Sequence, residues 1–401
     1  MSDADRLLAA FDSGELLRPT PGTPNLVDLT RAIALLCGAE DAERTPAAEA
    51  IADRIGVAQH LIFVLADGLG MNLLQSMPRG AFLRRRLAME LCTVFPSTTA
   101  VVLTTLATGE WPAQHGITGW WTYVREVDGA VTVVRFERRS DARHLNELGV
   151  RTEQLLPLPS WLSRMDRDAL SLLPRAIVDS SYSRYAAGGT RREGYGSLRA
   201  AVDAVVEHVL EADSPTYTYL YVPRIDSAAH EHGSHNRYVT AELAALDQQL
   251  ERLAERLAGQ RARIVLSADH GHLDAPMAKR HLINGGEDLA ATFRVAPSYD
   301  SRVMCFHLRD GAEQAFRAAI ERQLGDIVFV LSVNEVEELE LLGPGGLSRL
   351  TRERLGDFVA IARGADAIGY RPAMGGREIM GKASHHSGLA PDEMRIPLLI
   401  A

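Results

Sequence analysis

The chain has 401 residues, 46% of them hydrophobic and 24% charged, which is the composition of a globular protein. Its 52 acidic and 43 basic residues give a formal net charge of −9, which argues against a nucleic-acid polymer or an anionic membrane as its partner. The N-terminus lacks a signal-peptide pattern, no apolar run reaches the ~18 residues of a membrane span, and the three cysteines stand far apart, so we expect a cytoplasmic protein without a disulfide framework.

Helical and strand-like segments alternate along the chain. Apolar runs such as His60–Ala66 (HLIFVLA) are typical of strands buried on both faces of a parallel sheet. In chain order we predict a helix at Leu26–Leu36, strands at His60–Ala66 and Leu91–Phe95, a helix at Ala100–Ala107, a strand at Tyr217–Val222, a helix at Arg237–Leu257 and a strand at Arg263–Ser267. This alternation predicts an α/β fold: a doubly wound, mostly parallel central sheet with helices on both faces.

Two segments fit the alternation less well, and we interpret both as insertions within a single catalytic domain of residues 1–401. Residues 124–200 include the polar, glycine-rich stretch Tyr182–Tyr195 and are expected to form a lid-like insertion. Residues 276–375 contain strand-like runs of their own and a helix near Gly311–Leu324, so they are expected to form a small α/β cap. The strand-like runs are Arg302–His307, Asp326–Leu331 and Phe358–Ala362.

Aspartate and histidine recur just after the predicted strands. Because ligands bind outside the carboxyl ends of the strands in open α/β sheets, these side chains are expected to converge there. Carboxylates and imidazoles suit divalent metal ions that keep open positions for a substrate. The residues are Asp67, Asp226, His230, Asp269, His270 and the late pair His385 and His386.

A threonine follows the second predicted strand at the start of a helix. There the hydroxyl of Thr99 could be ionised by a metal ion with help from the helix dipole. Two metal ions roughly 4 Å apart can stabilise both the attacking and the leaving oxygen of a phosphoryl displacement. Each residue alone is weak support, since an aspartate after a strand is usually a turn residue, but their joint occurrence favours a metal centre.

Six segments, in this order and spacing from about residue 60 onward, carry a resemblance to a known family. They are LADGLG (Leu65–Gly70), FPSTTA (Phe95–Ala100), LATGEWPAQHGITGW (Leu106–Trp120), YVPRIDSAAHEHG (Tyr221–Gly233), SADHGH (Ser267–His272) and HSGLAPDEMRIPLLI (His386–Ile400). With them the chain resembles the nucleotide pyrophosphatase/phosphodiesterase (type I phosphodiesterase) family of the alkaline phosphatase superfamily. The combination is far more specific than any one segment.

The resemblance implies a role for each matching residue. Asp67, Asp269 and His270 would hold one zinc ion, with Thr99 bridging to it as the nucleophile. Asp226, His230 and His386 would hold a second zinc ion, although manganese or iron would also suit these donors. Register favours His386 over His385, and Thr99 over Thr98.

The chain also departs from the family pattern. Diesterase relatives carry an asparagine where this chain has Trp120, so one donor to the substrate phosphate is missing. We expect a substitute, because losing such a donor costs ~2.7–4 kcal/mol of transition-state stabilisation. The candidates are the Thr99 amide and three arginines of the first insertion, Arg184, Arg191 and Arg192. Trp120 and Tyr123 could form a wall for a nucleobase or an aryl leaving group, and a buried packing role is equally open.

The sequence therefore predicts a phosphoric-ester hydrolase with two divalent metal ions, most simply a phosphodiesterase or nucleotide pyrophosphatase acting through a phospho-threonine on Thr99. Its substrate would be a small phosphodiester or nucleotide-like molecule. A phosphomonoesterase or a phosphonate hydrolase would use the same metals, and a non-catalytic metal-binding protein is the alternative from another class. The natural substrate and the oligomeric state cannot be read from the sequence.

Overall fold

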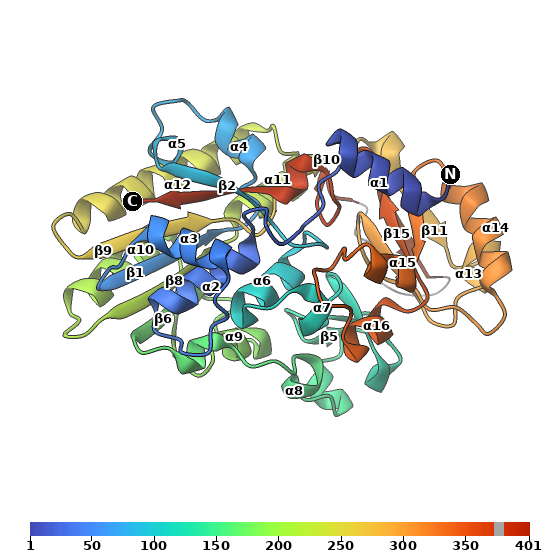
Figure 1. Cartoon of the computed structure of the whole chain (residues 1–401), viewed down its shortest axis with the longest axis horizontal. Helices are drawn as coiled ribbons and strands as arrows, with labels where there is room; N and C mark the ends of the chain where they lie inside the picture. The colour runs from blue at the N-terminus through green and yellow to red at the C-terminus, as the bar shows by residue number, and fades with distance from the viewer. Residues whose placement is uncertain (373–380) are drawn as a thin grey trace.

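A seven-stranded sheet in the order β2-β18-β9-β1-β8-β6-β7 forms the larger half of the computed structural model, which describes residues 1–372 and 381–401 (Figure 1). Its strands are β1 His60–Ala66, β2 Leu87–Cys92, β6 Asp168–Pro174, β7 Arg191–Tyr195, β8 Thr216–Val222, β9 Ala262–Ser267 and β18 Arg395–Ile400. All adjacent strands pair in parallel except β18, which runs antiparallel to both β2 and β9. The predicted α/β class with a mostly parallel sheet is confirmed.

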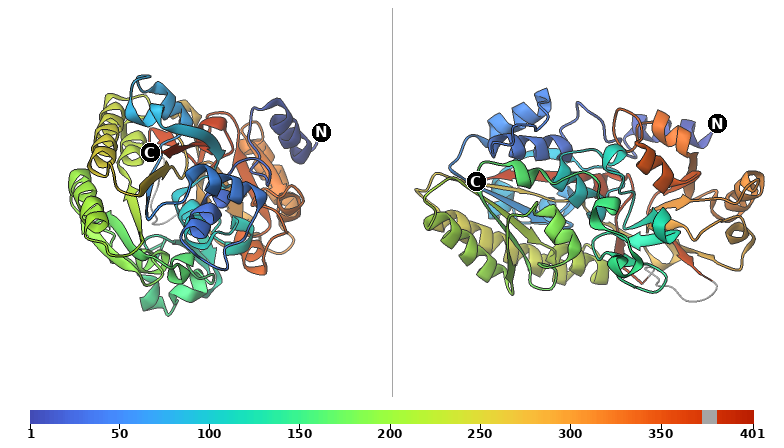
Figure 2. Two further views of the ribbon diagram at one scale, coloured as in Figure 1. Left: turned by 60° about the vertical axis from the view of Figure 1, so that its left-hand side comes forward. Right: turned by 90° about the horizontal axis from the view of Figure 1, so that it is seen from below.

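Helices cover both faces of this sheet. Seen from below in Figure 2, the early helices lie on one side of the strands and the helices of the middle of the chain lie on the other. The first group is α2 Leu26–Leu36, α3 Pro46–Ile55 and α6 Thr99–Thr108, and the second is α10 Leu198–Leu210, α11 Arg224–His232 and α12 Arg237–Arg256. The short helices α4 Met71–Ser76 and α5 Phe82–Arg85 follow β1, and α5 packs against α12. The strand β1 is buried along its whole length, as its uninterrupted apolar run predicts.

The segment between residues 124 and 200 is divided between two sheets. Its first part contributes to a separate three-stranded sheet, β3 Trp121–Val124, β4 Gly129–Thr132 and β5 Glu137–Arg138. Its second part supplies β6 and β7, which extend the central sheet beyond β8. Residues 168–195 are thus part of the sheet framework and not a lid above it. The α-helices of this region are α8 Thr152–Leu155, α9 Ser181–Ala186 and α10, and the short helix α7 Pro112–His115 precedes it.

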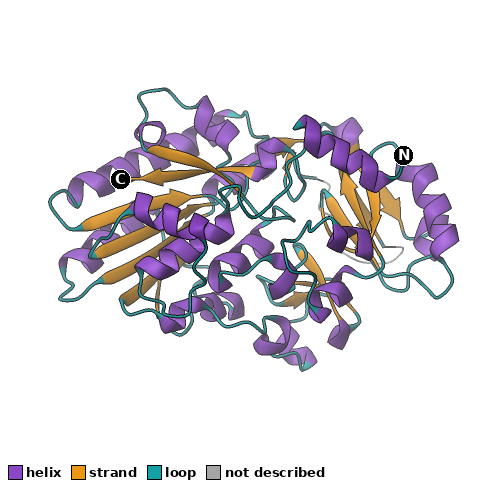
Figure 3. Ribbon diagram, in the orientation of Figure 1, coloured by secondary structure: helices purple, strands orange, loops and turns teal. Residues whose placement is uncertain are grey.

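A second, smaller group of strands lies apart from the central sheet (Figure 3). Its four-stranded sheet has the order β12-β13-β15-β14, and it includes the strand-like runs expected in residues 276–375. The strands of this region are β10 Leu273–Asp274, β11 Arg280–Asn284, β12 Ser298–Asp300, β13 Val303–Phe306, β14 Val328–Ser332, β15 Phe358–Ala362, β16 Ala367–Arg371 and β17 Ser384–His385. Its helices are α13 Asp288–Ala291, α14 Glu313–Leu324, α15 Val333–Glu338 and α16 Arg349–Leu355, whereas α17 Pro391–Met394 leads into β18 of the central sheet. Residues 373–375 of the expected cap lie outside the described residues.

The N-terminal helix α1 (Asp3–Ser13) packs on the smaller sheet and not on the central one. Its apolar side chains Leu7 and Ala10 belong to the same buried cluster as Phe329 and Ile361 of that sheet. The amide of Val330 in β14 donates to the Asp3 carboxylate (2.8 Å). The structure has no helix, in the ranges that it describes, that is long and apolar enough to cross a lipid bilayer.

A buried ion pair joins the smaller sheet to the core. Arg302, which directly precedes β13, donates through Nε to Glu393 Oε1 of α17 (2.8 Å), and both side chains are almost fully buried. Arg302 also donates to the carbonyls of Asp366 and Gly364, and Glu393 accepts the amide of Gly388. Because a buried charge without its partner is strongly unfavourable, this pair fixes the segment around Gly388 against the smaller sheet.

Candidate active site

The carboxyl ends of three neighbouring strands carry the acidic residues of the site. Asp67 directly follows β1, Asp269 follows β9 after one residue, and Asp226 lies in the first turn of α11 after β8. Because β9, β1 and β8 are adjacent and parallel, their ends lie at one edge of the sheet. The convergence that the sequence predicts at this edge is therefore present in the structure.

Asp67, Asp269 and His270 form one group of potential ligands whose donor atoms lie within 4.8 Å of one another. The Nε2 atom of His270 lies 3.2 Å from Asp269 Oδ2 and 3.7 Å from Asp67 Oδ1. The other oxygens of the two carboxylates are used by the protein: Asp67 Oδ2 accepts the Tyr221 hydroxyl, and Asp269 Oδ1 accepts the amide of Gly68. One oxygen of each carboxylate is thus left for another partner.

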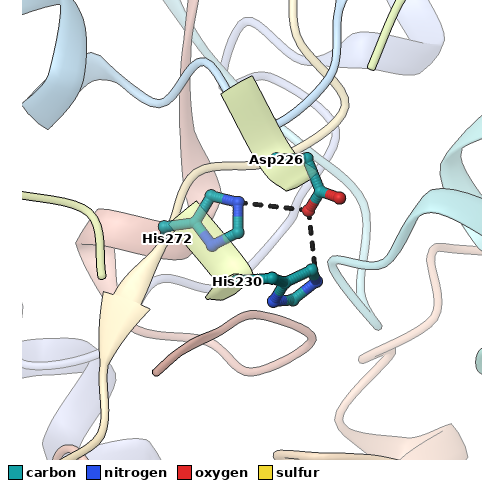
Figure 4. Close-up of side chains that lie close together, drawn as sticks. All are labelled: Asp226, His230 and His272. Atoms are coloured by element: carbon teal, nitrogen blue, oxygen red, sulfur yellow. Dashed lines mark ion pairs between the residues drawn. The ribbon is translucent and has the colours of Figure 1, made fainter. Parts of the chain in front are cut away.

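A second group surrounds a single oxygen of Asp226 (Figure 4). The Nε2 atoms of His230 and His272 each lie 3.2 Å from Asp226 Oδ1, and that of His386 lies 3.7 Å away. The Nε2 atoms of His386 and His230 face each other at 3.1 Å. Three imidazoles from different parts of the chain thus point at one carboxylate oxygen.

Hydrogen bonds on the far side of the rings determine which nitrogen carries the proton. The Nδ1 atoms of His230, His270 and His386 contact the carbonyls of Ser384 (2.7 Å), Gly271 (3.0 Å) and Ser97 (3.1 Å). A carbonyl only accepts, so each Nδ1 is the donor and each Nε2 of a neutral ring presents a lone pair to the centre of the site. Histidines that bind metals show this pattern, in which the outer nitrogen donates to a carbonyl or carboxylate.

The residues present fit divalent cations. Four buried atoms of these carboxylates and imidazoles have no hydrogen-bond partner within the described residues: Asp67 Oδ1, Asp226 Oδ1, Asp269 Oδ2 and His272 Nε2. Carboxylate oxygens and bare imidazole nitrogens repel one another at 3.1–3.7 Å unless positive charge lies between them. Burial raises the pKa of Asp67 well above its usual range, and the neighbouring carboxylates of Asp269 and Asp226 raise it further. The arrangement is that of a metal centre.

The hydroxyls of Thr98 and Thr99 have different surroundings. Thr99 is the first residue of α6, and its Oγ1 lies 3.3 Å from His270 Nε2 at the edge of the first group. Thr98 is fully buried, and its hydroxyl donates to Asp300 of β12. Only the Thr99 hydroxyl is therefore available for chemistry at the site.

His385 and His386 also point to different environments. His386 belongs to the ligand group with Asp226 and His270, and its ring stacks on that of His270 with centroids 3.6 Å apart. His385 pairs with Leu273 in the short β10–β17 ladder, and burial lowers its pKa to about 3. The structure brings His386 and not His385 to the cluster.

A cavity of about 480 Å³ opens beside the potential metal ligands. Asp67, Thr99 and Asp226 line it, and so does Trp120. Tyr123 is absent from the described lining; its hydroxyl donates to Asp128 and accepts from Arg294, and its ring lies 4.1 Å from that of His307. Of the two aromatic residues proposed as a substrate wall, the structure brings only Trp120 to the cavity.

None of the three arginines proposed as phosphate donors is among the described residues that line the cavity. Arg184 donates to the carbonyl of Asp179, Arg191 contacts His208 and Glu193, and Arg192 donates to the carbonyl of Val178. The cationic side chains that do line the cavity are Arg135 and Lys382. No sequence pattern marks them, because an isolated basic residue in a loop carries no sign of where the loop folds.

His272 is a further residue whose position the sequence left open. It is fully buried, and its Nδ1 contacts the hydroxyl of Ser384 (3.1 Å) while its Nε2 faces Asp226. Gly68 makes room for it: a Cβ at this glycine, whose φ is +78°, would lie 2.7 Å from His272 Nε2. Spacing gives a partial signal, since His272 follows the candidate ligand His270 by two residues.

Comparisons with known proteins give one family and a set of similar folds. A family model described as type I phosphodiesterase / nucleotide pyrophosphatase matches residues 61–387. None of the curated proteins compared with the chain matches it. Among solved structures, human ectonucleotide pyrophosphatase/phosphodiesterase 5 aligns with a TM-score of 0.63 at 15% identity, covering 85% of this chain and 87% of that one.

Two further structures show the same fold. An inactive variant of the murine ectonucleotide pyrophosphatase/phosphodiesterase 5, in complex with AMP, has a TM-score of 0.62 at 14% identity, with 84% of this chain and 87% of that one covered. Phosphonoacetate hydrolase from Sinorhizobium meliloti, in complex with phosphonoformate, has a TM-score of 0.57 at 18% identity, with 84% and 89% covered. At these identities the likeness concerns the fold.

Proposed function

The chain belongs to the type I phosphodiesterase / nucleotide pyrophosphatase family and is thus a hydrolase of phosphoric esters. On this premise we propose that it cleaves small phosphodiesters or pyrophosphates, nucleotide-like molecules among them. Its nucleophile in this proposal is Thr99. The observation that supports this most directly is the position of the Thr99 hydroxyl. It lies between the cavity and the cluster of unpartnered carboxylate and imidazole atoms.

We assign two metal ions to this group of carboxylates and imidazoles. Asp67, Asp269 and His270 would bind one, next to Thr99; Asp226, His230 and His386 would bind the other, with His272 directed at the same Asp226 oxygen. Two divalent cations, when bound, would lower the pKa of the Thr99 hydroxyl and neutralise the phosphate oxygens. We propose zinc as the ion, since carboxylate and imidazole donors suit it, and the same donors accept manganese or iron.

The proposed reaction has two steps on Thr99. In the first, the Thr99 hydroxyl gives its proton to water, Oγ1 forms a bond to phosphorus while the bond to the leaving ester oxygen breaks, and the leaving oxygen takes up a proton from water. In the second, a water molecule attacks the phospho-threonine and restores the threonine hydroxyl. The start of α6 favours both steps, because the helix dipole stabilises negative charge at Thr99.

A second candidate activity, phosphomonoester hydrolysis, gains support from Lys382 and Arg135. A monoester carries two negative charges and needs cationic groups to bind its free oxygens, whereas a diester carries one. Both side chains line the same cavity as Thr99.

The two activities are separated by a rate comparison on metal-loaded protein with bis-(p-nitrophenyl) phosphate and p-nitrophenyl phosphate. We expect the diester to react faster, and a chelator to abolish its turnover. A faster monoester would favour phosphatase activity. No turnover of either ester, with two metal ions bound, would contradict the proposed substrate class.

Lys382 is expected to bind a non-bridging phosphate oxygen in place of the missing asparagine donor. Replacing it in Lys382→Met should lower kcat/KM by about 100-fold, the loss typical of one such donor. Lys382→Arg, which keeps the positive charge, should restore most of the activity. The matched control is Arg184→Met, since the exposed Arg184 is bonded to Asp179 away from the cavity. Equal rates for Lys382→Met and the wild type would rule out this role.

A further inference from the structure

The cavity beside Thr99 extends away from the charged groups into an apolar chamber. Its described lining has 29 residues, of which only Asp67, Asp226, Arg135 and Lys382 carry charge. We propose that this chamber binds a hydrocarbon group of the substrate, so that the enzyme acts on phosphoric esters of long-chain apolar alcohols. The proposal rests on the proposed function and narrows its substrate class.

The walls of the chamber come from the central sheet and from α6. Alternate residues of β8, Tyr217, Tyr219 and Tyr221, line one side, as the two-residue period of a strand requires. On α6, Leu103 and Leu106 line the opposite side at i+4 and i+7 from Thr99, so they share its face of the helix.

These positions give the depth of the chamber. Thr99 and Leu106 are seven residues apart on a helix that rises 1.5 Å per residue, so the lining extends about 10 Å below the nucleophile. Tyr221 and Tyr217 are four residues apart along β8, or about 13 Å. A chamber of this length and of about 480 Å³ accepts an extended hydrocarbon chain in line with Thr99.

Many polar atoms of the chamber walls already have partners within the protein. Trp161 Nε1 donates to the carbonyl of Leu106 (2.8 Å), and the hydroxyls of Tyr182 and Thr104 bond to each other (3.2 Å). Ser183 donates to the carbonyl of Ile177, and Thr30 to that of Leu26. A nucleobase would bury donors and acceptors against groups that are already satisfied, which is unfavourable, whereas a hydrocarbon gains from the same walls.

The aromatic rings of the walls are held in fixed orientations. Phe63 stacks with Tyr219 at 6.0 Å between centroids, and Trp161 meets Tyr217 edge-on at 5.6 Å. Rings fixed in this way keep the chamber open without a ligand, so binding does not have to order the walls.

The test measures the dissociation constants of n-alkyl phosphates, from ethyl to decyl, by calorimetry on the metal-loaded Thr99→Ala variant, which lacks the proposed nucleophile and therefore does not turn these monoesters over. We expect about three- to fourfold tighter binding per added methylene until the chamber is filled, since each buried methylene contributes ~0.8 kcal/mol. Adenosine 5′-phosphate is the comparator with a polar organic group and should bind more weakly than decyl phosphate. Affinity that does not rise with chain length, or tighter binding of adenosine 5′-phosphate, would overturn the proposal.

Two variants test whether the dependence of affinity on chain length arises in the chamber. Ala107→Phe fills the chamber from α6, and Ser171→Leu fills it from β6; each should flatten the dependence on chain length. Ala258→Phe introduces the same ring at an exposed position after α12 and should keep the wild-type dependence. If both filling variants keep it as well, the hydrocarbon binds elsewhere and the proposal is wrong.

Because binding is measured without turnover, the inference and the proposed function fail separately. Chain-length-dependent binding without hydrolysis of any phosphoric ester would leave the chamber intact and contradict the proposed reaction. Conversely, p-nitrophenyl alkyl phosphates of short and long alcohols could be hydrolysed with equal kcat/KM. That result would support the proposed reaction and exclude the long-chain substrate class.

Discussion

Replacing Thr99 by alanine is expected to lower kcat/KM for a phosphodiester by about 10⁴-fold or more, since the variant lacks the proposed nucleophile. The fold should tolerate the change, because the hydroxyl of this buried residue makes a single hydrogen-bond contact within the described residues, with His270 Nε2 at 3.3 Å. Initial rates on bis-(p-nitrophenyl) phosphate together with the melting temperature test both expectations. Thr99→Ser keeps a hydroxyl at the same position and should retain part of the activity.

The neighbouring threonine supplies the matched control. Thr98→Ala removes the hydrogen bond to Asp300 and leaves a buried carboxyl group without that donor. Such a loss costs about 1–3 kcal/mol, so this variant should melt at a lower temperature and still turn over substrate. The assignment of the nucleophile is wrong if Thr98→Ala abolishes turnover at a temperature where it is folded while Thr99→Ala remains active.

Removal of the metal ions is the second change with a large expected effect. A chelator should abolish turnover, and it should also lower the melting temperature, because the carboxylates and imidazoles then face one another without intervening charge. An ion present at a thousandfold excess over its dissociation constant stabilises the folded state by about 4 kcal/mol. Thermal melts with and without chelator, followed by addition of zinc, manganese or iron, measure the effect and identify the ion that restores activity.

Metal content provides a test that does not depend on activity. The native chain should bind two ions, and Asp226→Asn, which weakens the carboxylate that three imidazoles surround, should bind one. His281→Ala is the control, since His281 pairs with Asp366 outside the described ligand groups and should leave the metal content at two. A single ion in the native chain, or no change on chelation, would contradict the two-ion centre.

Much of the central sheet could be predicted from the sequence, and the reasons differ from strand to strand. The strand His60–Ala66 is predicted with the bounds of β1, because an uninterrupted apolar run between polar residues marks a strand buried on both faces. The strand β7 (Arg191–Tyr195) escapes prediction: it lies at the sheet edge, its sequence RREGY is polar, and its residues are exposed or half-buried. The local pattern of apolar and polar residues indicates how deeply a strand is buried, and an edge strand such as β7 is buried very little.

The residues of the site also differ in whether the sequence predicts them. Asp67, Asp226 and Asp269 are predictable because each follows a strand end, and parallel strands bring such ends together. Lys382 and the apolar chamber are not predictable, since they depend on where a loop folds and on which side chains leave space between β8 and α6. The sequence indicates which chemistry is present, whereas the packing of distant segments determines what the chemistry acts on.

The position of β18 has a consequence for how the protein is made. This strand, residues 395–400, lies between β2, which ends at residue 92, and β9, which ends at residue 267, so both neighbours come far earlier in the chain. During synthesis β2 therefore has no neighbour in the central sheet until residue 400 has emerged from the ribosome. Unpaired strand edges are sites of aggregation, so the nascent chain should depend on chaperones until this late strand is inserted. The same delay applies to the proposed metal centre, because His386, one of its proposed ligands, comes only nine residues before β18.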